Sequence, residues 1–219
     1  MVSRFNIVGT IAVIVTLYAS CLFAGEVDSN SSEETRPEVS CELKVRERYE
    51  FYDVEGKTLD ELRKQMKKNG TKWTDGNVYS ALTTWDIKYR YDIFNDNGRD
   101  LIKSVNTKVN IIYRLPRMTV AGTDPELTTL WNNYLARLQD HECGHKDIAV
   151  KAASEINEIF VSLAGFTSED ELEEQISLRT EEKFRQLKVL QIEYDDETRH
   201  GETQGAILPA NDATRLAGA

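Results

Sequence analysis

Residues 124–160 read DPELTTLWNNYLARLQDHECGHKDIAVKAASEINEIF, and this stretch decides the fold. Asp124 offers an N-cap and Pro125 a first-turn proline, which together mark the start of a helix. The side chains that follow recur at the helical period and so share one face. They are Leu130, Trp131, Tyr134, Leu138, His141, His145, Ile148, Ala152, Ile156 and Phe160. The pattern predicts one long, partly buried helix.

The chain before this helix is typical of strands. Residues 41–54, 81–93 and 102–113 are rich in β-branched and aromatic residues in near alternation. The run Asn95-Asp96-Asn97-Gly98 lies between the last two and predicts a tight hairpin turn. Thr58-Leu59-Asp60-Glu61 matches a capping box, so a helix should run from there to about Lys68.

A second helical pattern follows the long helix, over residues 167–192, and residues 194–219 are expected to be mostly loop. The sequence therefore predicts an α+β fold. We expect a small antiparallel sheet, made of the hairpin and the N-terminal strand, packed with the long helix and a second C-terminal helix in a zincin-like arrangement.

The first 24 residues differ in kind from the rest. Arg4 is followed by an apolar run, residues 7–24, which stops at Gly25-Glu26. This is typical of a secretory signal peptide cleaved after Ala24, and Cys21 offers an alternative lipoprotein site. An uncleaved membrane anchor is the other alternative, because the run is long enough to span a bilayer. We expect an exported protein, in the periplasm or outside the cell.

Beyond this segment, residues 25–40 are polar and read as a linker, and residues 41–219 form one domain, of which 206–219 could be a flexible tail. The 27 basic residues are outnumbered by 37 acidic residues, for a net charge of −10. This balance argues against a nucleic-acid partner. Any membrane contact is expected only through an uncleaved or lipidated N-terminus.

The chemistry is concentrated in His141-Glu142-Cys143-Gly144-His145. Residues four apart on a helix are separated by about 40° and about 6 Å, so both imidazoles can bind one metal ion. Glu142 would stand beside the ion, where a general base accepts a proton from activated water. Cys143 would face the opposite side. It could pair with Cys41 or remain a buried free thiol.

A catalytic zinc ion usually has three protein ligands and one open position. Ile148 and Lys151 stand where the metzincin pattern needs glycine and histidine, so that ligand set is excluded. His200, in a loop before Gly201, is the stronger candidate for the third ligand. A carboxylate from the second helix is the alternative; those available are Glu171, Glu174, Glu181 and Glu182.

Three residues near His200 are candidates for supporting roles. Tyr194 and Arg199 could donate a hydrogen bond to a developing oxyanion, although packing within a loop explains them equally well. Asp195 could orient a ligand imidazole through its other ring nitrogen.

Several segments resemble a bacterial family of predicted secreted zinc-dependent proteases. They are Leu82-Thr83-Thr84-Trp85, Trp131-Asn132-Asn133-Tyr134 with the histidine motif, and residues 194–206. The resemblance covers roughly residues 41–209. It implies an exported metallopeptidase-like domain with one zinc ion, His141 and His145 as ligands, Glu142 as catalytic residue, and His200 in a motif suited to a third ligand.

These observations predict a zinc-dependent metallopeptidase that hydrolyses a peptide or protein substrate. Glu142 would act as general base, with Tyr194 as a further catalytic candidate. Two alternatives stay open: a zinc hydrolase for another amide, such as a cell-wall cross-link peptide, and a non-catalytic metal-binding module. The intact Glu142 argues against the module, because a site without catalysis has no need for that carboxylate.

Overall fold

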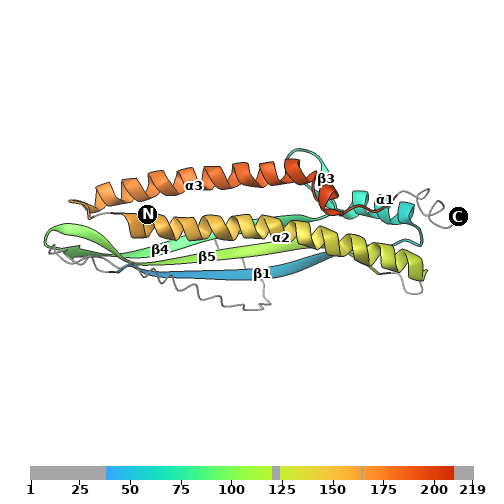
Figure 1. Ribbon diagram of the computed structural model, residues 1–219, viewed down its shortest axis with the longest axis horizontal. Coiled ribbons are helices and arrows are strands. Elements are labelled where there is room, and N and C mark those ends of the chain that lie inside the picture. The colour runs from blue at the N-terminus through green and yellow to red at the C-terminus, as the bar shows by residue number, and fades with distance from the viewer. Residues whose placement is uncertain (1–37, 120–123, 164, 210–219) are drawn as a thin grey trace, which may run out of the picture.

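The computed structural model describes residues 38–119, 124–163 and 165–209. It is an elongated α+β fold in which α2 and α3 lie along a long sheet (Figure 1). The elements are β1 (Ser40–Val54), α1 (Leu59–Asn69), β2 (Thr71–Lys72), β3 (Val78–Tyr79), β4 (Leu82–Asp96), β5 (Arg99–Met118), α2 (Pro125–Ser162), α3 (Glu169–Thr198) and a short 3-10 turn (Glu202–Gln204).

The main sheet is mixed, which corrects the expected antiparallel sheet. Its strand order is β1-β5-β4, with β5 in the centre. β4 and β5 form the expected hairpin, and Asn97 and Gly98 in its turn have φ of 51° and 81°. β1 pairs with the other edge of β5 in parallel, from Ser40 opposite Ser104 to Val54 opposite Met118. Alternation along a strand reveals its two faces, but not which neighbour it pairs with or in which direction.

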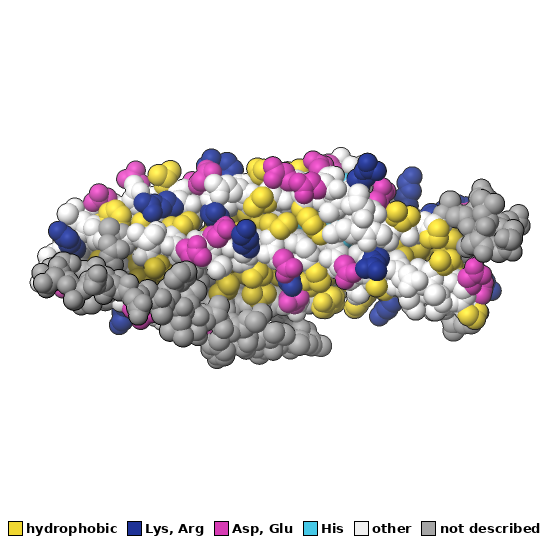
Figure 2. Space-filling model, viewed as in Figure 1, with side chains coloured by type: hydrophobic (Ala, Val, Ile, Leu, Met, Phe, Trp, Pro, Cys, Tyr) yellow, Lys and Arg dark blue, Asp and Glu magenta, His cyan; other side chains and the backbone are white. Residues whose placement is uncertain are grey.

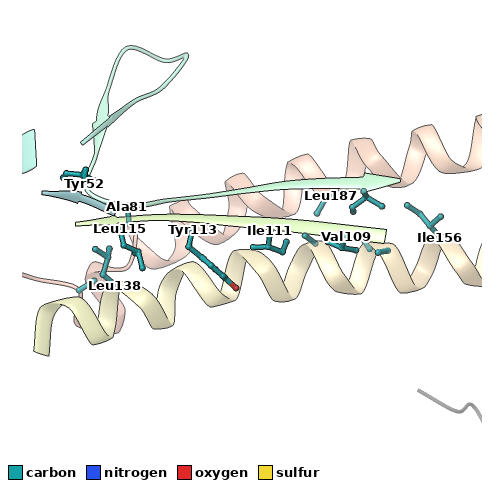
Figure 3. Packing of buried hydrophobic residues seen from close by; sticks show 14 of the residues in the cluster. Tyr52, Ala81, Val109, Ile111, Tyr113, Leu115, Leu138, Ile156 and Leu187 are labelled. Carbon is teal, nitrogen blue, oxygen red and sulfur yellow. The ribbon is translucent and has the colours of Figure 1, made fainter. Parts of the chain in front are cut away.

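The hydrophobic core lies between the sheet and α2. Alternate residues of β5 are buried on this side, and their side chains point toward α2 (Figure 3). They include Val105, Val109, Ile111, Tyr113 and Leu115. Leu138 and Ile156 of α2 and Leu187 of α3 belong to the same cluster. The long helix predicted from residues 124–160 is therefore confirmed, and its apolar face is covered.

α3 runs back along α2 and extends further than the sequence suggested. Ser168 caps its start, with its side chain accepting from Glu171 N. The helix continues to Thr198. Tyr194 and Asp195 are therefore helical, whereas the sequence predicted that they lie in a loop. Acidic residues near a helix C-terminus are unfavourable, and here the packing of the last turns on α2 outweighs that cost.

The chain reverses sharply after α3. Arg199 and His200 both adopt left-handed φ, of 50° and 53°, and His200 N donates to Asp195 O at 2.9 Å. Left-handed backbone is unfavourable for residues other than glycine. This closure returns the chain to α2 and places His200 beside the final turn of α3.

At one end of the sheet, α1 and the β2–β3 hairpin join β1 to β4. The predicted N-cap at Thr58 is confirmed, since Glu61 N donates to Thr58 Oγ1 at 3.3 Å. The reciprocal bond differs from a capping box: Glu61 Oε2 accepts from Lys57 N at 2.7 Å and not from Thr58 N. Leu62 and Met66 of α1 are buried in the core. The connection keeps the end of β1 and the start of β4 at the same end of the molecule.

The expected signal peptide at residues 1–24 and most of the linker at 25–40 lie outside the described residues, as does most of the expected tail at 206–219. No helix within the described ranges is both long enough and apolar enough to cross a bilayer. Among the described residues no disulfide joins Cys41 to Cys143, and Cys143 is partly exposed, not buried as expected. Acidic and basic side chains are interspersed over the visible sides of α2 and α3 (Figure 2).

Candidate metal centre

Three potential ligand atoms meet where the middle of α2 faces the last turns of α3. His145 Nε2 lies 3.3 Å from His141 Nε2 and 3.1 Å from Asp195 Oδ1. His141 Nε2 lies 3.2 Å from the same Oδ1. A tetrahedral ion with bonds of about 2.0–2.1 Å has neighbouring ligand atoms about 3.3 Å apart. The three atoms are therefore spaced like one face of a tetrahedral metal site.

The two helices position these side chains. His141 and His145 are one turn apart on the side of α2 that faces α3, and both are buried, at 3% and 9% exposure. Asp195 comes from the last turn of α3, and its side chain is 30% exposed. Asp195 therefore forms the solvent-exposed, open side of the cluster.

Both imidazoles are held in the tautomer that a metal ligand needs. His141 Nδ1 lies 3.0 Å from Gln204 Oε1, and His145 Nδ1 is hydrogen-bonded to Gln191 Oε1. An amide oxygen only accepts, so each Nδ1 carries the proton and donates it. In the neutral ring that a metal ion binds, the lone pair is then on Nε2, the atom that points into the cluster, whereas Nε2 can donate to Asp195 only in the protonated ring.

The two glutamines are themselves fixed by further hydrogen bonds. Gln191 Nε2 donates to His145 O at 3.0 Å, which ties α3 to the backbone of α2. Gln204 Nε2 donates to Tyr194 Oη at 2.9 Å. In both glutamines the NH2 group donates a hydrogen bond elsewhere, which orients the amide oxygen toward the imidazole Nδ1.

Tyr194 packs against the histidine helix instead of pointing its hydroxyl into the cluster. Its ring stacks on that of His141, and its hydroxyl donates to His141 O at 3.2 Å. A Cβ at Gly144 would lie 2.1 Å from the Tyr194 hydroxyl oxygen. Gly144 is therefore the position that lets α3 approach α2.

Glu142 is buried next to the two histidines, on the side of the sheet. It is 4% exposed, and its Oε2 accepts a hydrogen bond of 2.6 Å from Thr83 Oγ1 at the start of β4. Burial raises the pKa of this carboxyl, while Thr83 and the two imidazoles lower it. The net pKa is raised. A carboxyl group with a raised pKa is suited to accepting and returning a proton near neutral pH.

The acidic member of the cluster is strongly stabilised in its charged form. Burial raises the pKa of Asp195, but hydrogen bonds from His141 and His145 outweigh burial and hold it well below the usual range. For His145, burial lowers the pKa, and the hydrogen bond to Asp195 raises it above its ordinary value. Without a metal ion, the cluster therefore contains the charged carboxylate of Asp195, which favours the protonated form of His145.

His200 lies at the margin of this cluster. Its Nδ1 is 3.2 Å from Asp195 Oδ1, and its side chain is 51% exposed. It does not belong to the group of described residues whose ligand atoms all lie within 4.8 Å of one another, which is His141, His145 and Asp195. The structure thus places Asp195, expected to orient an imidazole, in the position expected for His200.

The other sequence candidates lie elsewhere. Arg199 forms the left-handed cap of α3. Glu171, Glu174 and Glu181 are exposed on α3, and Glu182 pairs with Arg185. None of these four carboxylates belongs to the cluster within the described residues.

Sequence reasoning missed the roles of Gln191, Gln204 and Thr83. One signal was available for α3: Gln191, Tyr194, Asp195 and Thr198 are spaced three, four and seven residues apart. That spacing places them on one helical face. It was overlooked because the chain beyond residue 192 was expected to be a loop. The contacts of Gln204 and Thr83 depend on tertiary packing, and the sequence alone gives no sign of them.

A bacterial family of proteins of unknown function, DUF922, matches residues 49–201, more than half of the chain. The match includes the three residues of the cluster and both Glu142 and Thr83. No curated protein and no solved structure shows a significant match to the chain.

Proposed function

The chain belongs to the bacterial family of unknown function DUF922, and we propose that it is a zinc-dependent peptidase. His141, His145 and Asp195 would hold one zinc ion, and the fourth position would face the open side of the cluster. The observation that carries the proposal is the spacing of three ligand atoms, 3.1–3.3 Å apart, beside the buried carboxyl of Glu142. We also propose that the sheet and the histidine helix form a zincin-like scaffold.

The donor set favours zinc over harder cations. Two neutral imidazoles and one carboxylate are common ligands of catalytic zinc, whereas magnesium and calcium prefer oxygen ligands. A bound zinc ion would acidify a water molecule and polarise the carbonyl group of the substrate.

The chain's own residues would then move the proton. Glu142 accepts it from the attacking water and returns it to the leaving amine, as its raised pKa allows. Thr83 holds the carboxyl in position through its 2.6 Å hydrogen bond. Gln191 and Gln204 keep the protons of the two ligand imidazoles on Nδ1. Each Nε2 is then available to bind the metal ion. Tyr194 serves as a positioning residue for His141.

The predicted signal at residues 1–24 would deliver this enzyme outside the cytoplasm, where peptides or proteins of the envelope are available as substrates. This part of the proposal rests on the apolar run in the sequence.

The test is cleavage of an unbiased peptide library by the zinc-loaded protein, followed by mass spectrometry, with Glu142→Gln as the control. Wild type should cut peptides, and Glu142→Gln should bind zinc without cutting. Equal cleavage by both would exclude Glu142 as general base. If neither cuts any peptide, a parallel arm with cross-linked cell-wall peptides distinguishes another amide hydrolase from a protein without hydrolytic activity.

A further inference from the structure

A pocket of about 630 Å³ lies next to the candidate metal centre. α1 and the β2–β3 hairpin form its walls, at the end of the molecule where α3 finishes (Figure 1). Arg63 and Lys67 of α1 line it together with Tyr79, Ser80 and His200. Among the described residues that line it there are two permanent cations and no carboxylate. The pocket therefore offers positive charge in a chain whose net charge is −10.

His200 connects this pocket to the metal centre. It lines the pocket, and its Nδ1 is 3.2 Å from Asp195 Oδ1. Its ring also contacts that of Tyr79, with centroids 5.2 Å apart. A substrate bound at the cluster could place a neighbouring group directly in the pocket, because one side chain separates the two.

The wall that carries the cations is firmly placed. α1 meets β3 so closely at Gly70 that a Cβ there would lie 2.5 Å from Tyr79 O. Tyr79 is held in turn by Asp75, whose Oδ2 accepts from its hydroxyl at 2.6 Å. Packing thus fixes the two walls of the pocket, α1 and the β2–β3 hairpin, against each other.

Arg63 and Lys67 differ in the partners that their charged groups have within the protein. Arg63 is paired with Asp60 at 2.7 Å and also donates to Leu208 O at 3.0 Å. Lys67 is exposed and has no ion-pair partner within the described part of the chain. The nearby carboxylates are engaged: Asp60 by Arg63, Asp75 by Tyr79 and Asn77, and Asp195 by the three imidazoles around it. Lys67 is therefore the charge that remains for a ligand.

We propose that this pocket is a substrate subsite for a carboxylate group, with Lys67 as its specificity-determining residue. The carboxylate could belong to an acidic side chain near the scissile bond or to the C-terminus of a peptide. The inference rests on the proposed peptidase function, and it adds the chemical class of substrate. An ion pair with an exposed lysine is worth about 0.2–1 kcal/mol, which corresponds to a preference of up to about fivefold over a neutral analogue.

The test measures binding and turnover separately. Fluorescent peptides of one sequence carry Glu or Gln next to the scissile position, each with a free or an amidated C-terminus. Their affinities are measured by anisotropy on zinc-loaded Glu142→Gln, which needs no turnover, and their kcat/KM values on the enzyme with Glu142 intact. If Glu and Gln peptides differ more in affinity, the carboxylate is that of an acidic side chain. If peptides with a free and an amidated C-terminus differ more, it is the terminal carboxylate.

Lys67→Glu is compared with Lys68→Glu, which makes the same charge change at the next position of α1, outside the residues that line the pocket. We expect a preference of up to about fivefold for the carboxylate peptides, abolished by Lys67→Glu and kept by Lys68→Glu. Equal binding of all four peptides, or equal effects of the two variants, would overturn the subsite. Preferential binding without cleavage would support the subsite and count against the peptidase.

Discussion

The ring of Tyr194 lies flat against the ring of His141, with centroids 5.1 Å apart and 9° between the planes. The contact joins α3 to α2 at the turn that carries the first candidate ligand. It exists because residue 144 has no side chain: a Cβ there would lie 2.4 Å from Tyr194 Cζ. The packing of α3 against α2 thus requires glycine at position 144 of the motif.

Gly144→Ala should therefore destabilise the protein. Helix propensity alone predicts a gain of about 1 kcal/mol from this change, whereas overpacking against Tyr194 predicts a loss of about 1–3 kcal/mol. Denaturant unfolding of the metal-free protein measures the balance. In a Tyr194→Ala background the clash is gone, so the same change should become neutral or stabilising. A stabilising effect of Gly144→Ala in the wild-type background would contradict the packing.

Loss of either glutamine acceptor should weaken metal binding without abolishing it. Gln204→Ala and Gln191→Ala leave the Nδ1 proton of one imidazole without its partner. Comparable changes around zinc sites cost about 10–100-fold in affinity. Competition with a chromophoric chelator measures the zinc affinity, and Gln186→Ala, an exposed glutamine of α3, is the control. Unchanged affinity in both variants would show that the tautomers are set in another way.

The stability of the metal-free protein should depend on pH through His145 and Asp195. The raised pKa of His145 gives a stabilising contribution that is complete below its unfolded value and is lost as pH rises through the folded value. The lowered pKa of Asp195 also gives a stabilising contribution. It is fully present when the pH is above the pKa of Asp195 in the unfolded chain, and it is lost as the pH falls toward the pKa in the folded protein. Both contributions are present together between about pH 4 and 6.5.

Urea unfolding of wild type and Asp195→Asn at several pH values checks this. The stability advantage of wild type should be largest in that window and should shrink toward alkaline pH. An advantage that grows above neutral pH would be inconsistent with the charged pair.

Thr83→Val should move the acid limb of the pH–rate profile to higher pH. Thr83 donates to the Glu142 carboxyl and lowers its pKa, so its loss leaves burial less opposed. Glu142 would then become a base only at higher pH, because the hydrogen bond that favours its charged form is gone. Thr84→Val, the next residue of β4 on its other face, is the control. Superimposable profiles for wild type and Thr83→Val would contradict the role of Thr83.

Local patterns predicted much of this molecule. The period of residues 124–160, the N-cap at Thr58 and the turn at Gly98 each depend on a few neighbouring residues, and all are found in the structure. The parallel pairing of β1 with β5 could not be predicted in this way, because it depends on which edge of the hairpin the strand meets.

The site was predicted in part for the same reason. His141, Glu142 and His145 are fixed by their spacing on one helix. Asp195 depends on a second helix whose last turn carries the acidic run 195–197, and acidic residues disfavour a helix C-terminus. Once that turn packs on α2 through Tyr194, the carboxylate reaches the imidazoles, and His200 passes to the edge of the cluster.

The central claim is that His141, His145 and Asp195 form one zinc site. Its most direct test is the zinc content of purified wild type, Asp195→Ala and His200→Ala, each loaded with excess zinc, passed through a desalting column and measured by elemental analysis. The account predicts one zinc ion per chain in wild type and in His200→Ala, and a large loss in Asp195→Ala. Full zinc in Asp195→Ala together with its loss in His200→Ala would contradict it.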